Sequence, residues 1–334
     1  MNLKLSSILL LISFSSLADN NGFIVGVGIH PTSYQIPANN LVSLLSKYDI
    51  KSIRFDYPWS HVEKKKGIYT SPDNILNELP VLASNNDIST LLILDYGNDF
   101  YGGWKPSSPE QIDAFSNYAS WVAQHYKGRK VIYEIWNEWS HDSKKNNYDP
   151  KSDRSAIEYV SLVKSVSQAI KNIDKTATVI AGGFNPINGP DRRWGVKIIN
   201  LGVYKYVDGI SIHPYSYQRM DTVSPNYNIS ILKNFEREIN ENKKNKIKLY
   251  ITEFGYPNYS NGIGLNSKDR EKYPAEYISE VKKLGFVKGI WWYDFINDGN
   301  DANNRQHNFG LLDSSHRQKF EMKGFQQAIS ENSQ

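Results

Sequence analysis

Eight short runs of apolar residues recur along this chain, and longer segments with the period of an α-helix lie between them. The runs are rich in Val, Ile and Tyr, and their apolar character is continuous rather than alternating, as in parallel strands that are covered on both faces. They occupy residues 23–29, 52–57, 89–96, 131–136, 177–183, 207–213, 248–254 and 289–295. Eight strand–helix units in 334 residues predict a single-domain α/β fold, the (β/α)8 or TIM barrel.

Four segments between these runs have the spacing of amphipathic helices. They are residues 108–128, 152–173, 228–242 and 269–285. The first opens on Ser-Pro-Glu and stops at a glycine, which are helix start and stop signals. Pro274 predicts that the last helix starts or is interrupted there. The competing architecture is an open doubly wound sheet, but the stretch "GVGIHP" lacks the third glycine of a phosphate-binding turn.

The N-terminus has the layout of a secretory signal peptide. Lys4 precedes the apolar run "ILLLISF", and the small residues "SSLA" follow it up to Ala18. The run is too short to span a bilayer, and the alternative is that it forms a first buried strand or helix of the fold. We therefore expect a signal peptide over residues 1–18, a catalytic domain over residues 19–334, and a secreted or periplasmic protein without a membrane anchor.

Composition excludes several kinds of chemistry. The chain has no cysteine, which rules out thiolate catalysis, disulfides and cysteine-ligated metals. Its net charge is +4, but Lys and Arg are spread along the chain in short clusters, so we expect no nucleic-acid partner. This weakly basic balance slightly favours an acidic partner such as an anionic polysaccharide.

Polar side chains gather where the predicted strands end, and the active site of a β/α barrel lies at the carboxyl ends of its strands. These residues are His30, Arg54, Asp56, Asp95, Tyr96, Asn137, Glu138, Asn185, His213, Tyr215, Glu253, Trp292 and Asp294. Glu138 ends the fourth strand and Glu253 the seventh, so their carboxylates can face each other across the barrel mouth. Two facing carboxylates suit glycoside hydrolysis, in which one protonates the leaving oxygen and the other attacks the sugar or activates water.

Five motifs in strand order resemble those of clan A glycoside hydrolases, in particular family 39 and the cellulase-like family 5. They are "SIRFDYPWSHVEKKKGIY", "IWNEW", "SIHPY", "ITEFGYP" and "GIWWYDFINDG". The resemblance covers nearly the whole chain after the signal peptide, and some family 39 enzymes cut bacterial exopolysaccharides. Tyr96 stands where many family 5 members carry histidine, which moves the likeness toward family 39.

The resemblance implies a retaining mechanism with Glu138 as acid/base and Glu253 as nucleophile. It places Arg54 as the charge partner of Glu253 and Tyr215 as a hydroxyl donor to it. Burial of Glu138 beside Trp136 and Trp139 would keep it protonated near neutral pH.

The same resemblance implies the substrate contacts. Asn137 would donate to the sugar 2-hydroxyl, and His213 would support the hydrogen-bond network. Trp292, rather than Trp291, would offer a flat face to the sugar, and Tyr96 and Trp139 are the other predicted substrate-binding residues.

We expect a monomer that needs no cofactor or metal and acts on a polysaccharide or oligosaccharide, such as a β-linked glucan, mannan, xylan or bacterial exopolysaccharide. Two alternatives remain open. One is a metal-dependent hydrolase with His30, Asp56, Asp95 and His213 as ligands, although the chain lacks the closely spaced histidines of a specific metal motif. The other is a sugar-binding barrel without activity, which would need neither glutamate.

Overall fold

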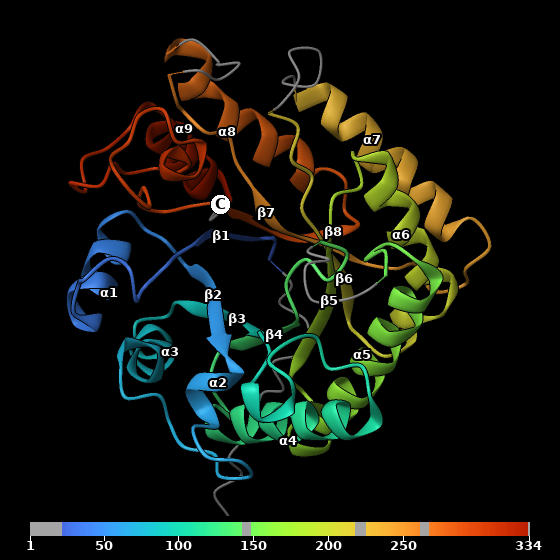
Figure 1. The fold of residues 1–334 in the computed structure, drawn as a ribbon. Coiled ribbons are helices and arrows are strands. Elements are labelled where there is room, and N and C mark those ends of the chain that lie inside the picture. The colour runs from blue at the N-terminus through green and yellow to red at the C-terminus, as the bar shows by residue number, and fades with distance from the viewer. Residues whose placement is uncertain (1–21, 142–147, 218–224, 261–266, 333–334) are drawn as a thin grey trace, which may run out of the picture.

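The eight predicted strands form one closed barrel of parallel strands, so the predicted TIM barrel is confirmed (Figure 1). Each strand pairs with the next along the chain, and β8 closes the barrel against β1. The computed structural model describes residues 22–141, 148–217, 225–260 and 267–332. The predicted signal peptide lies outside these ranges.

The strands agree with the predicted runs to within a few residues. They are β1 (Ile24–Gly28), β2 (Ser52–Pro58), β3 (Ser89–Asp95), β4 (Val131–Ile135), β5 (Thr178–Phe184), β6 (Gly209–Ile212), β7 (Leu249–Phe254) and β8 (Val287–Trp292). The largest difference is at β8, which begins two residues before the predicted run and ends three residues before its end. Residues 293–295, expected in the strand, therefore begin the loop at the barrel mouth.

Helices surround the barrel on the outside, as Figure 1 shows. They are α1 (Ala38–Lys47), α2 (Trp59–Val62), α3 (Ile75–Asn85), α4 (Pro109–His125), α5 (Asp153–Ile173), α6 (Gly189–Asn200), α7 (Pro225–Asn240), α8 (Ser267–Lys282) and α9 (Phe320–Asn332). Short 3-10 turns are η1 (Asp99–Tyr101), η2 (Val203–Lys205) and η4 (Arg305–Asn308).

Side chains fix the starts of the predicted helices. Ser108 and Gln111 form a capping box at α4, with Pro109 in the first turn, and Ser152 accepts from the third residue of α5. Pro274 departs from its prediction, because α8 begins before it at Ser267 and continues through it. A helix can accommodate an internal proline where neighbouring structure supports it, and here α9 packs so closely against α8 that a Cβ at Gly324 would lie 1.9 Å from the Glu271 carbonyl oxygen.

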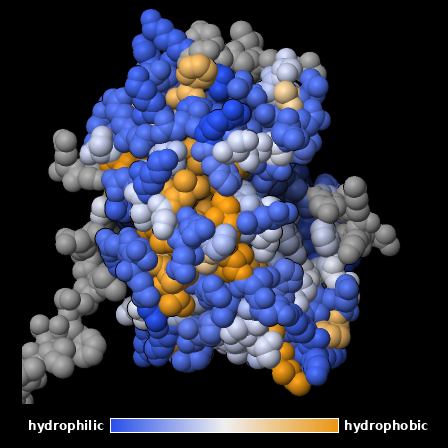
Figure 2. Space-filling view, turned by 90° about the vertical axis from the view of Figure 1, so that its left-hand side faces the viewer, coloured by the Kyte–Doolittle hydropathy of each residue, from blue (hydrophilic) through white to orange (hydrophobic). Residues whose placement is uncertain are grey.

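Two apolar layers hold the barrel together. Inside it, a buried cluster combines Trp291 of β8 with five residues from β3, β4, β5 and β7: Leu91, Ile93, Ile132, Ile180 and Tyr250. A larger cluster fills the space between strands and helices. The face in Figure 2 is mostly hydrophilic, with apolar residues gathered near its centre. Among the described residues, no helix is long and apolar enough to cross a membrane.

Candidate active site

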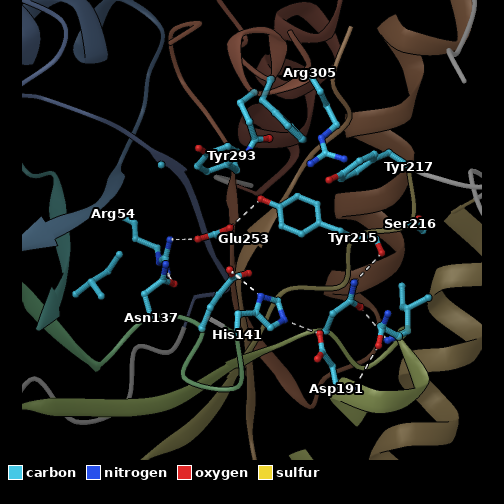
Figure 3. Close-up of a pocket in the computed structure, with 18 of the residues that line it drawn as sticks. Arg54, Asn137, His141, Asp191, Tyr215, Ser216, Tyr217, Glu253, Tyr293 and Arg305 are labelled. Atoms are coloured by element: carbon cyan, nitrogen blue, oxygen red, sulfur yellow. Dashed lines mark hydrogen bonds and ion pairs between the residues drawn. The ribbon is translucent and has the colours of Figure 1, made fainter. Parts of the chain in front are cut away.

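A cavity of about 890 Å³ opens at the carboxyl ends of the strands, where the sequence predicts the site. Its volume is in the range of ligand-binding pockets. The predicted residues Arg54, Tyr96, Asn137, Tyr215 and both glutamates line it. Figure 3 shows the side chains of Arg54, Asn137, Tyr215 and Glu253 converging on the same space.

Glu253, the last polar residue of β7, is held by one donor from β2 and one from the loop after β6. Arg54 of β2 donates through Nη1 to Oε1 of Glu253 at 2.7 Å, and the Tyr215 hydroxyl donates to Oε2 at 2.9 Å. The same guanidinium donates through Nε to Glu134, which is fully buried inside the barrel, at 2.8 Å. These contacts stabilise Glu253 as a carboxylate and fix its direction.

Glu138 lies opposite and contacts two imidazole rings. Its Oε1 lies 3.2 Å from Nδ1 of His213, and its Oε2 lies 3.0 Å from Nδ1 of His141. His141 in turn contacts Oδ2 of Asp191 at 2.8 Å, and Lys151 pairs with the other oxygen of Asp191 at 2.9 Å. A chain of charged groups therefore leads away from Glu138 through His141, as the dashed lines in Figure 3 show.

The two glutamates are close enough to act on one bond. Among the described residues, one carboxylate oxygen of Glu138, one of Glu253 and a ring nitrogen of His213 all lie within 4.8 Å of one another. His213 is buried below the cavity, with Nδ1 also 3.6 Å from Oε2 of Glu253 and Nε2 at 3.1 Å from the Thr252 hydroxyl. The imidazole thus fixes the relative positions of the two carboxyl groups.

The protonation of Glu138 differs from the expectation. Burial alone would raise its pKa, but the hydrogen bonds from His141 and His213 outweigh burial and hold the pKa of Glu138 well below its ordinary range. The hydrogen bond to Asp191, followed by that to Glu138, raises the pKa of His141 to about 9. In the free protein the proton of this pair therefore lies mainly on His141.

The backbone around Glu138 is in a strained conformation. Trp136 and Glu138 have φ angles of 64° and 46°, the left-handed region that non-glycine residues rarely adopt. Gly183 of β5 packs against this turn, and a Cβ there would lie 3.0 Å from the Glu138 nitrogen. Gly183 itself has a φ of 63°. Both the close contact and the positive φ angle therefore favour glycine at this position. The turn directs the Glu138 side chain into the cavity.

Asn137 and Tyr96 take up the predicted positions at the cavity wall. Asn137 accepts from Nη2 of Arg54 at 3.1 Å, which leaves its amide nitrogen to face Tyr96 at 3.4 Å. Tyr96 is 40% exposed. Both side chains can therefore reach a ligand in the cavity.

The predicted sugar contacts of Trp292 and Trp139 are wrong. Trp292 is fully buried between the barrel and α9, packs edge-on against Phe254 and Phe325, and donates to the Phe309 carbonyl at 3.0 Å. The strand pleat turns it outward, and Trp291 lies in the barrel interior, so Tyr293 is the aromatic residue of this segment that lines the cavity.

Trp139 is also fully buried, and its indole nitrogen donates to Ser155 at the start of α5. Trp136 packs edge-on against it. Neither indole lines the cavity, and the two imidazole contacts of Glu138, rather than the indoles, decide its protonation.

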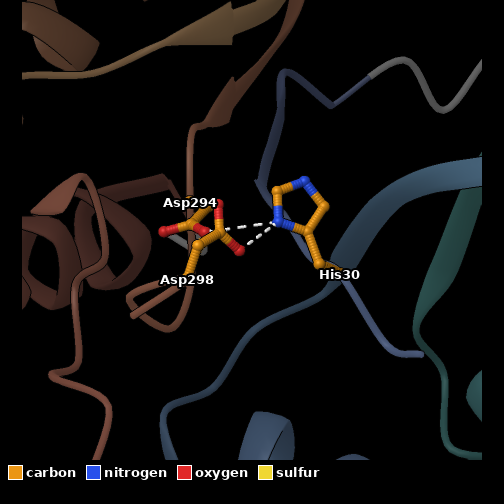
Figure 4. Close-up of side chains that lie close together, drawn as sticks. All are labelled: His30, Asp294 and Asp298. Atoms are coloured by element: carbon orange, nitrogen blue, oxygen red, sulfur yellow. Dashed lines mark hydrogen bonds and ion pairs between the residues drawn. The ribbon is translucent and has the colours of Figure 1, made fainter. Parts of the chain in front are cut away.

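A second polar cluster lies beside the cavity, between the ends of β1 and β8 (Figure 4). His30 contacts Asp298 at 2.5 Å and Asp294 at 3.7 Å. Burial lowers the pKa of His30, but the hydrogen bond to Asp298 and the charges of Asp298, Asp294 and Asp56 outweigh it and raise that pKa to about 9. Burial raises the pKa of Asp294 well above its ordinary range. These shifts favour a protonated His30 and a neutral Asp294.

The alternative metal set of His30, Asp56, Asp95 and His213 is not brought together. Among the described residues, the groups that could hold an ion are His30, Asp294 and Asp298, and Glu138, His213 and Glu253. His213 and His30 belong to different groups. Asp95 is fully buried, and burial raises its pKa well above its ordinary range, so it faces Asp56 as a neutral carboxyl group.

Sequence reasoning missed several residues that line the cavity: His141, Lys151, Asp191, Tyr217, Tyr293 and Arg305. They lie on loops beyond the strand ends, at the start of α6 or, for Arg305, at the start of η4. His141 follows Glu138 by three residues, which is a usable signal, but its partner Asp191 lies 50 residues further along. That pairing depends on the folded loops.

Comparison with known protein families finds one that spans most of the chain. Residues 18–295 match the model of the cellulase family, described as glycosyl hydrolase family 5. No curated protein matches the chain.

Solved structures share the barrel at low sequence identity. A family 39 glycoside hydrolase from Bacteroides cellulosilyticus WH2 is 24% identical, with a TM-score of 0.74 over 93% of this chain and 64% of that one. The exo-β-1,4-mannosidase Op5Man5 from Opitutaceae bacterium strain TAV5 is 15% identical, with a TM-score of 0.67 over 94% of this chain and 62% of that one. This chain thus spans less than two thirds of either.

Xylanase 10B from Thermotoga maritima is closer in length. It is 16% identical, with a TM-score of 0.66 over 93% of this chain and 95% of that one. At these identities the structural likeness shows a common fold.

Proposed function

The chain belongs to glycosyl hydrolase family 5, and from this premise we propose that it is a retaining enzyme that cleaves β-glycosidic bonds in a polysaccharide or oligosaccharide. In this proposal Glu138 is the general acid and base, and Glu253 is the nucleophile. The reaction proceeds by double displacement, through a sugar bound covalently to Glu253.

The observation that carries this proposal is the approach of the two carboxylates across the barrel mouth. Their nearest oxygens lie within 4.8 Å of each other. Retaining glycosidases have carboxyl groups about 5 to 5.5 Å apart, whereas inverting enzymes leave about 6.5 to 9.5 Å for a water molecule between them. The spacing therefore supports direct attack on the anomeric carbon.

The surroundings of each carboxylate support the division of roles. Glu253 receives donors from Arg54 and Tyr215, so it stays ionised and its oxygens are held in place for attack. The side chain of Glu138 is 33% exposed, whereas that of Glu253 is 11% exposed. Glu138 also contacts a protonated His141. A proton is thus available to Glu138 when the leaving oxygen needs it.

Each half of the reaction uses both residues. First, Glu253 forms a bond to the anomeric carbon while Glu138 protonates the departing glycosidic oxygen. Then Glu138, now a carboxylate, takes a proton from water, and the hydroxide replaces Glu253 at the sugar. Asn137, held by Arg54 at 3.1 Å, is placed to donate to a sugar hydroxyl beside the bond that breaks.

We also propose that the enzyme is a monomer. We further propose that it acts outside the cytoplasm, since Lys4, the following apolar run and Ala18 have the arrangement of a signal peptide. The names of the structural relatives, a mannosidase and a xylanase, support including β-mannans and β-xylans among the candidate substrates.

The test is release of reducing ends from a panel of β-glucans, β-mannans, β-xylans and bacterial exopolysaccharides. The parent protein is compared with Glu138→Gln and Glu253→Gln, which remove one charge each with little change in shape. We expect the parent to cleave at least one polymer and both variants to lose at least a thousandfold in kcat. Folded parent protein that binds a polymer but cleaves none would instead indicate a sugar-binding barrel.

A further inference from the structure

Five basic side chains line the cavity among the described residues, and four of them contact carboxylates of the protein itself. The five are His30, Arg54, His141, Lys151 and Arg305. Arg54 pairs with Glu134 and Glu253, His141 with Glu138 and Asp191, Lys151 with Asp191, and His30 with Asp298. Within the part of the chain that the structure describes, Arg305 pairs with no carboxylate. Its charge is therefore available to a ligand.

Arg305 is held beside an aromatic ring rather than free in solvent. Its Cζ lies 5.4 Å from the centre of the Tyr217 ring, and its Nε is buried without a hydrogen-bond acceptor. Figure 3 shows the guanidinium next to Tyr217, on the side of the cavity that holds Tyr215 and Tyr293. A guanidinium that rests on an aromatic face loses little freedom when it binds, because its plane is already oriented.

The position of Arg305 relates directly to the reacting residues. The ring centres of Tyr217 and Tyr215 are 5.6 Å apart, and the Tyr215 hydroxyl donates to Glu253 at 2.9 Å. Two tyrosine rings therefore separate Arg305 from the proposed nucleophile. A group that Arg305 binds therefore lies on a sugar in the same cavity as the proposed nucleophile.

The chemistry of the Arg305 guanidinium indicates which kind of ligand it binds. Guanidinium presents parallel N–H donors that match the two oxygens of a carboxylate, and such charge-assisted pairs are stronger than neutral hydrogen bonds. The hydroxyl groups of a neutral sugar could accept hydrogen bonds from the guanidinium, but they would leave its positive charge without a counter-charge. The nearby carboxylates do not oppose an anion, because Asp191 and Glu253 are paired with Lys151 and Arg54.

We propose that Arg305 and Tyr217 form a subsite for the carboxylate of a uronic acid, so that the substrate is an acidic β-linked polysaccharide. This inference rests on the proposed glycosidase function and adds the substrate class. The net charge of +4 agrees with it, because a positively charged protein attracts a polyanionic substrate.

The test compares two tetrasaccharides that differ only at C6, one of β-1,4-linked glucuronate and one of β-1,4-linked glucose. Binding is measured by calorimetry at low ionic strength, with Glu253→Gln as the common background so that the ligand stays intact. We expect the glucuronate form to bind at least tenfold more tightly, and we expect Arg305→Gln to bring this ratio close to one. Arg305→Lys, which keeps the charge but not the planar fork, should retain part of the preference.

Arg317→Gln is the matched control. Arg317 is 80% exposed, pairs with Asp313 and does not line the cavity, yet its substitution removes the same unit of charge. It should leave the ratio unchanged. Equal binding of the two ligands, binding of neither, or a preference that survives Arg305→Gln would each overturn the subsite.

The inference and the proposed function fail in different ways. Parent protein that cleaves a neutral polymer, with no preference for glucuronate in the binding test, would remove the acidic subsite and leave the glycosidase. A glucuronate preference that depends on Arg305, in a folded protein that cleaves no polymer, would leave the subsite and remove the catalytic function.

Discussion

The guanidinium of Arg54 donates to Glu253 at 2.7 Å, so a residue of β2 holds the proposed nucleophile at the end of β7. The same group reaches Glu134 inside the barrel and Asn137 at its mouth. Arg54 is 4% exposed, and its charge is balanced by two carboxylates. One side chain therefore joins the barrel interior to the proposed nucleophile.

Arg54→Met should lower both stability and activity. It leaves the buried carboxylate of Glu134 without a counter-charge, and breaking a buried pair in this way costs ~3–5 kcal/mol. The free energy of unfolding, measured in denaturant, should fall by about this amount, and kcat should fall because Glu253 loses a donor. Adding Glu134→Gln should recover part of the stability but not the activity, whereas full stability of Arg54→Met alone would contradict the pairing.

His141 should set the alkaline limit of activity. Because His141 holds the shared proton with a pKa of about 9, the pair of His141 and Glu138 keeps one proton until the pH reaches that value. Glu138 can act as an acid only while the pair holds the proton, so kcat/KM of the parent should decline near pH 9. In His141→Gln the carboxyl group of Glu138 has only His213 as an imidazole partner, and the decline should move well below pH 9, toward the range of an ordinary carboxyl group.

The pH profile of kcat/KM measures this shift, and two further variants sharpen it. Asp191→Asn keeps the imidazole but removes the charge that raises its pKa, so the decline should move partway down. His125→Gln changes a histidine on α4 that hydrogen-bonds Asn77 and does not line the cavity, so its profile should match the parent. An unchanged profile in His141→Gln would show that the pair does not share its proton.

Substitution of Trp292 should lower stability, whereas substitution of Tyr293 should weaken substrate binding. Trp292→Phe leaves the Phe309 carbonyl without its donor and should cost ~1–3 kcal/mol of stability, with KM close to that of the parent. Tyr293→Ala removes a ring from the cavity wall and should raise KM with a smaller effect on stability. Unfolding curves and Michaelis constants separate the two outcomes, and a large KM increase in Trp292→Phe would restore the tryptophan as a sugar contact.

The sequence carried enough information to predict the barrel and the two glutamates that face each other at its mouth. Continuous apolar runs mark buried parallel strands, and a glutamate that ends such a run has to lie at the barrel mouth. This is why Glu138, Glu253, Arg54 and Tyr215 could be placed before the structure. Their positions depend on strand order, which the chain specifies locally.

Side-chain direction and loop contacts could not be predicted in the same way. The choice between Trp291 and Trp292 depends on where β8 ends and on its pleat, and a shift of one residue reverses it. The protonation of Glu138 depends on Asp191, whose loop meets His141 only in the folded chain. Arg305 stands out only because the other cations of the cavity are seen to be paired.

The most direct test of the central claim is the product that Glu253→Ala forms from an activated β-glycoside in the presence of azide. If Glu253 is the nucleophile, azide fills the space left by its side chain and attacks the anomeric carbon itself. The variant should then be inactive alone, regain turnover with azide, and yield an α-glycosyl azide by NMR, while Glu138→Ala yields the β-anomer. A β-glycosyl azide from Glu253→Ala, or no rescue of a correctly folded variant, would contradict the assignment.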